Sequence, residues 1–400
     1  MTATNSFRIS GARIVDGSGQ APYEGSVVID DGRFTAVDAT AATAPSSIDV
    51  RGMTLLPGLI DAHTHLGLVG NMDHPPANWA LVAAQIWENC GLAIDAGFTT
   101  VRDDGGVAGV VASGAMRGSR ILPSGPIISE AGGNGDLYSP WSCCSGRWAQ
   151  GLPGLTTVGA ACRGPEDVRE TVRLTLRRGA TQVKVSLNTL LAQEATGADT
   201  EFSLAEVRVA VEEAHAKGTY VTGHAINSDG IRLGLAAGVE CFEHSGISDD
   251  ETAKAVAAAG APLVPTLTQI SLFEADPGTP AHLRVHNRVV REEMERSLLR
   301  AEAYGIPVGL GSDLEGVRQV HRGSELTRRA ALQGTMHALV SATAVNAAIL
   351  RRPDLGRIAV GATADAIVID GDPLADPGLF DRPESVVLVI KSGVVMKNLL

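Results

Sequence analysis

Two histidines stand one residue apart at the end of an apolar run, in the sequence PGLIDAHTHL. If residues 57–66 form a strand, successive side chains point to opposite faces, so His63 and His65 project to the same side. Imidazole nitrogens are common metal ligands, and two of them at one edge of a strand can bind the same ion. The pair therefore predicts a metal site at the end of this strand.

Four other polar residues lie in or at the end of apolar runs: Lys184 in QVKVS, His224 in VTGHA, His244 in FEHS and Asp313 in GLGSD. Taken singly, a histidine at a strand end is usually a hydrogen-bonded polar residue, and an aspartate after Gly-Ser can cap a helix. Lys184 is harder to explain this way, because an unpaired ammonium group between two valines is costly unless it is paired or chemically modified. Together these residues favour a site over a set of structural residues.

The middle of the chain alternates short apolar runs with helical patterns, which indicates strand–helix units around a parallel sheet. We expect eight strands, at residues 58–65, 99–103, 119–129, 181–186, 219–225, 239–245, 262–267 and 306–313. Eight such units close a (β/α)8 TIM barrel, whose active site lies at the carboxyl ends of the strands. Helix signals agree, since Ser203 and Glu206 have capping-box spacing before a helix that should end at Gly218, and Pro165 and Gly179 bracket another helix.

Both ends of the chain are rich in short β patterns cut by Gly and Asp turns. We therefore predict an α/β protein in which residues 1–57 and 361–400 form a composite, β-sandwich-like domain. Residues 58–360 would then be the barrel, which is inserted between the two halves of the β-domain. Residues 132–164 have no regular pattern, and we expect them to be a long loop of functional importance.

Composition limits the partners of the chain. A net charge of −12 and a pI near 5.3 argue against nucleic acid, whose binding needs clustered Lys and Arg. The first residues lack the pattern of a secretory signal, and no apolar run is long enough to span a membrane. Five cysteines without a CxxC pair favour neither disulfides nor a thiolate zinc site. We expect a soluble, cytoplasmic protein that acts on a small-molecule substrate.

The sequence resembles the amidohydrolase superfamily, and within it the imidazolonepropionase-like and Xaa-dipeptidase-like hydrolases. The resemblance covers essentially the whole chain, and it depends most on LLPGLIDAHTHL and on the closing LGRIAVGATADAIVIDGDPL. It implies two divalent metal ions, most simply Zn²⁺, and a homo-oligomer. His63 and His65 would bind the more buried ion, His224 and His244 the second, Lys184 would be a carboxylated bridging ligand, and Asp313 both a ligand and the proton shuttle.

The chemistry of these residues is consistent with that assignment. Reaction of Lys184 with CO₂ converts a buried cation into a carbamate anion that can bridge two metals. Two ions held by imidazole and carboxylate groups lower the pKa of a shared water. Asp313 can take the proton of that water as the hydroxide attacks a carbonyl carbon, and can return the proton to the leaving nitrogen.

Residues that would contact the substrate are less clearly indicated. Asn134 in GGNGD and Ile226 in GHAIN depart from dipeptidase-like relatives, which often have His at the first position and Tyr or His at the second. Further candidates after strands 1, 3 and 7 are His74, Trp141, Trp148, His282 and His286. Arg318 and Arg322 follow Asp313, and we interpret them as a solvated charged face rather than as contacts of a substrate carboxylate.

Three functions remain open from the sequence. The first is a binuclear hydrolase that cleaves the C–N bond of an amide, a carbamate or a dipeptide-like compound. The second is a mononuclear deaminase or cyclic-amide (imidazolone-type) hydrolase on the same fold, in which Lys184 would be an unexplained buried charge. The third is a non-catalytic barrel scaffold, which the complete set of predicted ligands disfavours.

Overall fold

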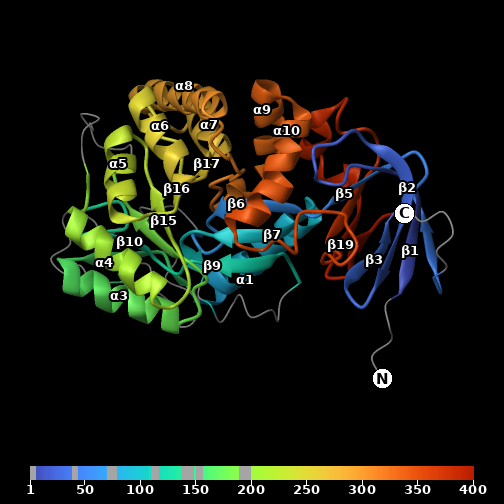
Figure 1. The fold of residues 1–400 in the computed structure, drawn as a ribbon, viewed down its shortest axis with the longest axis horizontal. Helices are drawn as coiled ribbons and strands as arrows, with labels where there is room; N and C mark the ends of the chain where they lie inside the picture. The colour runs from blue at the N-terminus through green and yellow to red at the C-terminus, as the bar shows by residue number, and fades with distance from the viewer. Residues whose placement is uncertain are drawn as a thin grey trace.

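The computed structural model describes residues 6–37, 44–69, 79–107, 109, 117–136, 148–149, 156–188 and 200–400. Within these residues the two ends of the chain share one sheet of eight strands (Figure 1). Its strands lie in the order β20 (Val394–Asn398), β19 (Val386–Lys391), β18 (Ala366–Ile369), β5 (Thr54–Pro57), β1 (Phe7–Ile14), β2 (Tyr23–Asp30) and β3 (Arg33–Val37), with β4 (Ser47–Asp49) paired with β1.

This sheet buries both of its faces, as the alternation of side chains along β18 shows. Ile367 and Ile369 pack into a cluster that includes Phe98 and Ile94 from the central part of the chain. Ala366 and Val368 point the other way, into a separate core formed by the chain ends. Because side chains in a strand alternate with a period of two, one sheet can serve both cores.

A partly buried ion pair also joins the end sheet to the central strands. Arg120 Nη1 lies 2.6 Å from Asp365 Oδ2, and Asp365 also accepts a hydrogen bond from the backbone N–H of Ser392. Arg120 belongs to the central strand β9 (Arg120–Pro123), whereas Asp365 and Ser392 flank strands of the end sheet. The contact fixes the two parts against each other.

The central part of the chain contains two sheets in which all but one of the strand pairings are parallel. One has the order β6 (Leu59–Thr64), β7 (Phe98–Asp103) and β9 (Arg120–Pro123). The other has the order β11 (Trp148–Ala149), β13 (Gly159–Cys162), β10 (Ile127–Glu130), β14 (Val183–Ser186), β15 (Val221–His224), β16 (Cys241–Glu243) and β17 (Leu263–Val264), and only β11 is antiparallel to its neighbour. Residues 124–126 connect β9 directly to β10.

The segment expected as the eighth strand forms bridges rather than a continuous strand. Gly309 N–H donates to Leu263 O of β17 at 2.8 Å, and Ala62 N–H of β6 donates to Leu310 O at 2.9 Å. Further along, Asp313 N–H donates to His63 O at 2.8 Å. The segment therefore lies between β17 and β6, and Asp313 is hydrogen bonded to the strand that carries the two adjacent histidines.

Residues 132–164 are not wholly irregular, which corrects the expectation of a long loop. The described part contains β13, which pairs in parallel with β10, and β12 (Thr156–Thr157), which pairs with β8 (Gly106–Val107). The Gly-rich composition of this segment hid the strands, because Gly159 has no side chain with which to show an alternating pattern. At this position a Cβ atom would lie 1.9 Å from Gly135 O, so only glycine fits.

In Figure 1, α3 to α8 form an arc around the parallel strands from the lower left to the top, and α9 and α10 lie between α7 and the end sheet. The helices are α1 (Trp79–Asp95), α3 (Pro165–Arg177), α4 (Leu204–His215), α5 (Ser228–Ala237), α6 (Asp250–Ala259), α7 (Leu267–Ala275), α8 (Ala281–Ala303), α9 (Ser324–Gln333), α10 (Thr335–Val340) and α11 (Asn346–Ile349), with a 3-10 turn η1 (Gly316–His321) and a π-helical turn η2 (Ser341–Val345).

The predicted helix signals are confirmed with one shift. Ser203 N–H donates to Glu206 at 2.9 Å and Glu206 N–H donates to the Ser203 hydroxyl, which completes the capping box of α4. The helix ends at His215, earlier than expected, because Gly218 N–H bonds back to His215 O in a closing turn. Pro165 begins α3, and Gly179 follows its end with a φ of 93°. No helix in the described residues is long and apolar enough to cross a membrane.

Helix α6 gives a test of local stability. Asp249 caps it by accepting the N–H of Thr252 at 2.7 Å, and although burial acts to raise the pKa of Asp249, the hydrogen bonds of Thr252 and Ser228 lower this pKa to about 2. Asp249→Ala should lower the free energy of unfolding by about 1 kcal/mol at neutral pH. The folded pKa is below the unfolded value of about 3.9, so the stabilisation is present above pH 4 and is lost as the pH falls toward 2. Urea titrations should show the difference in unfolding free energy narrowing between pH 4 and pH 2, and a constant difference would contradict this origin.

Candidate metal centre

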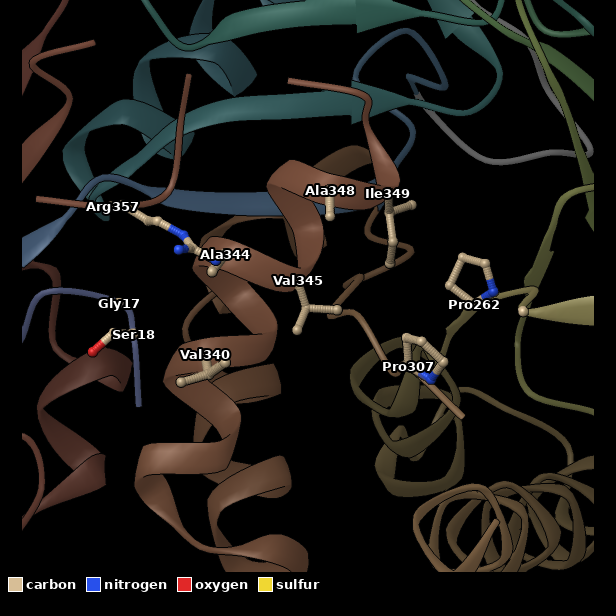
Figure 2. A pocket seen from close by; sticks show the side chains of 11 residues that line it. Gly17, Ser18, Pro262, Pro307, Val340, Ala344, Val345, Ala348, Ile349 and Arg357 are labelled. Carbon is tan, nitrogen blue, oxygen red and sulfur yellow. The ribbon is translucent and has the colours of Figure 1, made fainter. Parts of the chain in front are cut away.

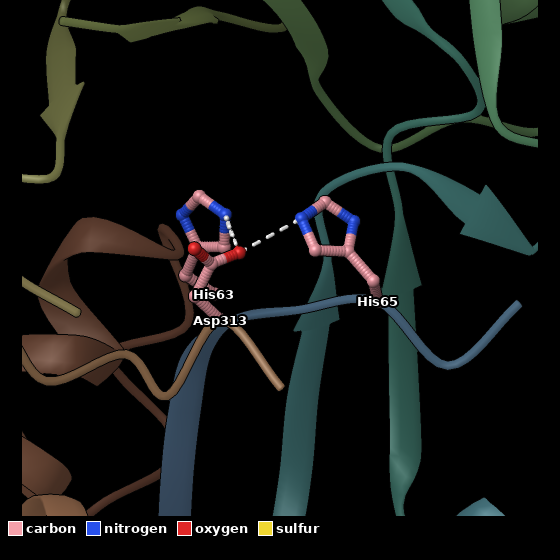
Figure 3. Close-up of side chains that lie close together, drawn as sticks. All are labelled: His63, His65 and Asp313. Atoms are coloured by element: carbon pink, nitrogen blue, oxygen red, sulfur yellow. Dashed lines mark ion pairs between the residues drawn. The ribbon is translucent and has the colours of Figure 1, made fainter. Parts of the chain in front are cut away.

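Asp313 lies between the two histidines of β6, as Figure 3 shows. Its Oδ1 atom is 3.3 Å from His63 Nε2 and 3.0 Å from His65 Nε2. Asp313 has a left-handed backbone with a φ of 57°, which turns its side chain back toward β6. These three residues offer ligand atoms within 4.8 Å of one another, so they can hold a metal ion together.

His224 and His244 complete a cluster of four imidazoles. The ring centroid of His244 is 4.3 Å from that of His224 and 4.8 Å from that of His63. His224 ends β15, and His244 follows β16 with a left-handed φ of 69°. Because β15 and β16 are parallel neighbours, both rings reach the same edge of the sheet. His244 Nδ1 also lies 3.8 Å from Asp313 Oδ2.

Lys184 lies beside this cluster and is 2% exposed. Its ammonium group is 3.2 Å from Asp104 Oδ2, and the same oxygen is 3.5 Å from His63 Nδ1. The structure therefore brings all six predicted ligands into one connected group. It also gives the buried charge of Lys184 a partner that the sequence did not reveal, Asp104.

Glu243 and Arg102 are further members of the site that sequence reasoning missed. Glu243 Oε2 accepts a hydrogen bond from His63 Nδ1 at 2.7 Å, and Arg102 Nη2 donates to Glu243 Oε1 at 2.6 Å. Glu243 also accepts from the hydroxyl of Thr222. A signal was present in FEHS and VRDD, since Glu243 precedes a predicted ligand and Asp104 follows a predicted strand end. Parallel strand ends meet at one edge, which would have placed these residues near the histidines.

The charges of the site are strongly coupled. Burial acts to raise the pKa of Asp313, but the nearby His63, His65 and His244 outweigh it and hold this pKa well below its usual range. Burial acts to lower the pKa of His65, yet its bond to Asp313 raises the value to about 9. Burial and the charge of Lys184 lower the pKa of His224 to about 3. The cluster thus contains both imidazoles that attract a proton and imidazoles that stay neutral.

Arg322 supports the loop that carries Asp313, which corrects the interpretation of this arginine as part of a solvated face. It is fully buried and forms an ion pair with Asp61, and Asp61 accepts hydrogen bonds from the N–H and the hydroxyl of Ser312 at 3.0 and 2.6 Å. The sequence pattern of η1 does not show this, because the partner of Arg322 lies 261 positions away. Arg318, in contrast, is partly exposed, and its guanidinium lies 4.4 Å from the centre of the Phe273 ring.

The predicted substrate contacts differ in burial and in position, and some lie outside the described residues. Asn134 is half-buried, and its backbone N–H donates to Glu201 at 2.8 Å, while Ile226 lies two residues after His224, the last residue of β15. His282 is exposed and His286 half-buried on α8, and among the described residues neither forms an ion pair or ring contact with the cluster. His74 and Trp141 lie outside the described residues, and of Trp148 only the backbone, in β11, is described.

A pocket of about 420 Å³ lies away from the cluster (Figure 2). Pro262 and Pro307 line one side of it, and Val340 and Ala344 line the helical side. The two prolines precede β17 and the segment that leads to Asp313, so the pocket lies at the amino ends of the parallel strands. It contains none of the predicted site residues, and its place in the fold separates it from the candidate metal centre.

Comparison with known proteins identifies the family of the chain. The model of the amidohydrolase family matches residues 54–396. The crystal structure of a prolidase complexed with N-methylphosphonate-L-proline is 33% identical in sequence, covers 98% of this chain and 100% of its own, and superposes with a TM-score of 0.88. Ochratoxinase from Aspergillus niger is 27% identical over 96% of this chain and 85% of its own length. A Xaa-Pro dipeptidase structure with bound methionine in its active site is 26% identical, with a TM-score of 0.84 and coverage of 98% and 99%.

The family model matches well over half of the chain, and the prolidase structure aligns over 98% of it. The chain therefore belongs to the amidohydrolase family and is a hydrolase that acts on carbon–nitrogen bonds.

Proposed function

We propose that this amidohydrolase holds two divalent metal ions at the histidine cluster and hydrolyses an amide, carbamate or dipeptide-like C–N bond. The observation that supports this proposal is the convergence of six buried or half-buried ligand groups at the carboxyl ends of parallel strands. These groups are His63, His65, Lys184, His224, His244 and Asp313. Their imidazole and carboxylate donors suit Zn²⁺.

The residues fit a pair of cations by a second criterion. Among the described residues, the buried Nε2 atoms of His63 and His224 make no well-aligned hydrogen bond, although Asp313 Oδ1 lies 3.3 Å from that of His63. A buried polar atom without a partner is costly, and a metal ion in the cluster would satisfy both nitrogens. Glu243 fixes the Nδ1 proton of His63, so that Nε2 keeps the lone pair that a metal needs.

Lys184 would be carboxylated in this proposal. Reaction of its amine with CO₂ would replace the Lys184–Asp104 ion pair by two anions. Such a pair of anions is stable in a buried site only if cations balance it. The carbamate and the two metal ions are therefore interdependent, and the loss of either should weaken the other.

Bound here, the metal ions would supply Lewis acidity and a water of lowered pKa. Asp313 would accept a proton from the attacking water at one carboxylate oxygen and deliver it to the leaving nitrogen. The low pKa of Asp313 keeps its carboxylate ionised at neutral pH. Arg322 and Asp61 hold the neighbouring Ser312 in place, which keeps Asp313 aligned with β6.

We also propose that the parallel strands close into a (β/α)8 barrel over residues 58–360. The pairings of residues 307–313 with β17 on one side and β6 on the other support closure. The residues before and after, 1–57 and 361–400, would form the composite β-domain around the shared sheet.

A mononuclear enzyme is the second candidate, and one observation favours it. Asp104 gives Lys184 a partner at 3.2 Å, so an unmodified lysine is not an unexplained buried charge. In that case Lys184 would remain an ammonium group, and His63, His65 and Asp313 would form the core of a single site.

Metal content separates the two candidates. Protein prepared with zinc and bicarbonate should contain two ions per chain and lose its activity on treatment with a chelator, and the mass of its Lys184 peptide under non-acidic conditions should include CO₂. Lys184→Met should retain about one ion, because the bridging group is gone. One ion in the unaltered protein, with an unmodified lysine, would favour the mononuclear enzyme.

Proton transfer is tested at Asp313. Asp313→Asn keeps the size of the side chain but removes the base, so turnover should fall by about 10²–10⁴-fold. Asp276→Asn is a matched control, since Asp276 is an exposed carboxylate after α7 that contacts Arg318 and the backbone N–H of Gly278 and, among the described residues, none of the candidate ligands. Turnover close to normal in Asp313→Asn, with a circular dichroism spectrum like that of the unaltered protein, would show that another group moves the proton.

Substrate choice is tested with a panel of compounds. Asn134 and Ile226 offer no charged group to a substrate carboxylate, so we expect compact N-acyl, carbamoyl or aryl-amide compounds with an apolar group to be hydrolysed faster than ordinary dipeptides. The names of two relatives, ochratoxinase and a Xaa-Pro dipeptidase, make ochratoxin and Xaa-Pro dipeptides the first compounds to compare. The ratio of kcat/KM values measures the preference. A panel in which charged dipeptides were best and apolar amides inert would overturn this expectation.

A further inference from the structure

The first turn of α7 is capped by a residue from another helix. Glu325 in α9 is fully buried, and its carboxylate accepts the backbone N–H of Leu267 at 3.2 Å and of Thr268 at 2.7 Å. The first N–H groups of a helix have no partner within the helix and are usually satisfied by the side chain of the N-cap residue. In α7 a carboxylate 57 residues further along the chain replaces that side chain.

The N-cap residue of α7 is Thr266, and its hydroxyl has a different use. Threonine is a good N-cap residue, but here its side chain makes no bond to the helix. Its Oγ1 atom instead lies 2.8 Å from Nδ1 of His244, and both groups are buried. The Thr266 hydroxyl is thus available to the histidine because Glu325 already satisfies the amides that it would otherwise cap.

The contact with Thr266 bears on which nitrogen of His244 carries the proton, because Nδ1 either donates to the hydroxyl or accepts from it. A neutral imidazole carries one N–H, and the bond made by one ring nitrogen sets the state of the other. If Nδ1 carries the proton and donates to Thr266, then Nε2 keeps a lone pair. His244 has a left-handed backbone, so the ring is not positioned by regular strand geometry and depends on such a contact.

We propose that Glu325 is a positioning residue for His244. By capping α7 it reserves the Thr266 hydroxyl for His244 Nδ1, and this fixes the tautomer and the orientation of the ring. The importance of the effect for metal binding rests on the proposed function, whereas the effect on the tautomer does not. Without Glu325, Thr266 can rotate to cap its own helix, and His244 loses its partner.

The tautomer can be measured without any metal. Long-range ¹H–¹⁵N spectra of metal-free protein with labelled histidine distinguish the two neutral forms, and a His244→Gln sample assigns the signal. The unaltered protein should show His244 with its proton on Nδ1. In Glu325→Gln one carboxylate oxygen is replaced by an NH₂ group, so the side chain can accept a hydrogen bond from only one of the two amides, Leu267 or Thr268. This variant should shift His244 toward a mixture of the two neutral tautomers.

Two further variants separate positioning from general stability. Thr266→Val removes the partner of His244 but leaves the cap of Glu325, so it should reproduce the shift, and adding Glu325→Gln to it should change the tautomer no further. Asp249→Ala is the matched control, because it also removes a carboxylate that caps a helix, in this case α6, which precedes α7. Among the described residues, the Asp249 side chain contacts none of the four histidines. This variant should leave the His244 signal unchanged. If Glu325→Gln fails to fold, Thr266→Val alone tests the step that involves the histidine.

The affinity for zinc provides the second measurement. Competition with a chromophoric chelator should show zinc binding weakened by about 10- to 100-fold in Glu325→Gln and Thr266→Val, and unchanged in Asp249→Ala. A His244 proton on Nε2 in the unaltered protein, or an unchanged signal in both variants, would overturn the proposal. If the tautomer shifts as expected but the unaltered protein binds no zinc, the positioning role holds and the proposed metal centre fails.

Discussion

Charge buried away from solvent is the constraint on which the rest of this structure depends. Lys184, Asp104, Arg102 and Glu243 are all almost completely inaccessible, and each has an oppositely charged partner. Removing one partner of such a pair leaves an uncompensated charge, which is far more destabilising than the pair itself is stabilising. The strands must therefore keep their relative positions closely. That rigidity also fixes the distances among the histidines, because the same strands carry both sets of residues.

The pairs connect different strands, and this explains their effect on the site. Arg102 comes from β7, Glu243 from β16, and the ring that Glu243 orients, His63, comes from β6. Arg102 also donates to the carbonyl of Ala62, so it contacts β6 directly. One guanidinium thus links three strands beneath the candidate metal centre. The ion pair of Arg322 and Asp61 likewise links β6 to the segment that ends in Asp313, because Asp61 also accepts hydrogen bonds from Ser312.

The parts of the site that could be predicted from the sequence are those with a local signature. His63 and His65 follow from the period of a strand, and the other ligands follow from strand ends that must meet at one edge. Strand ends could also have placed Asp104 and Glu243 near the histidines, but the partners of Arg102 and Arg322 could not be assigned in this way, because they lie on distant strands. An arginine with a partner more than a hundred positions away has the same local sequence as one on the surface, and only the fold distinguishes them. The same reason applies to the eighth strand, whose position is clear from its neighbours although it forms only bridges.

Backbone geometry adds a second kind of information that the sequence conceals. His244, Ser245 and Asp313 all have left-handed φ values, which are uncommon for residues with side chains. Such conformations cost free energy and persist only where surrounding contacts enforce them. Here the enforcing contacts are identifiable: the backbone N–H groups of Asp313 and Ser312 bond to His63 O, and the ring of His244 bonds to Thr266. The strain is therefore concentrated at the two chain turns that bring Asp313 and His244 toward the histidines of β6 and β15, where a regular strand would carry these side chains past the site.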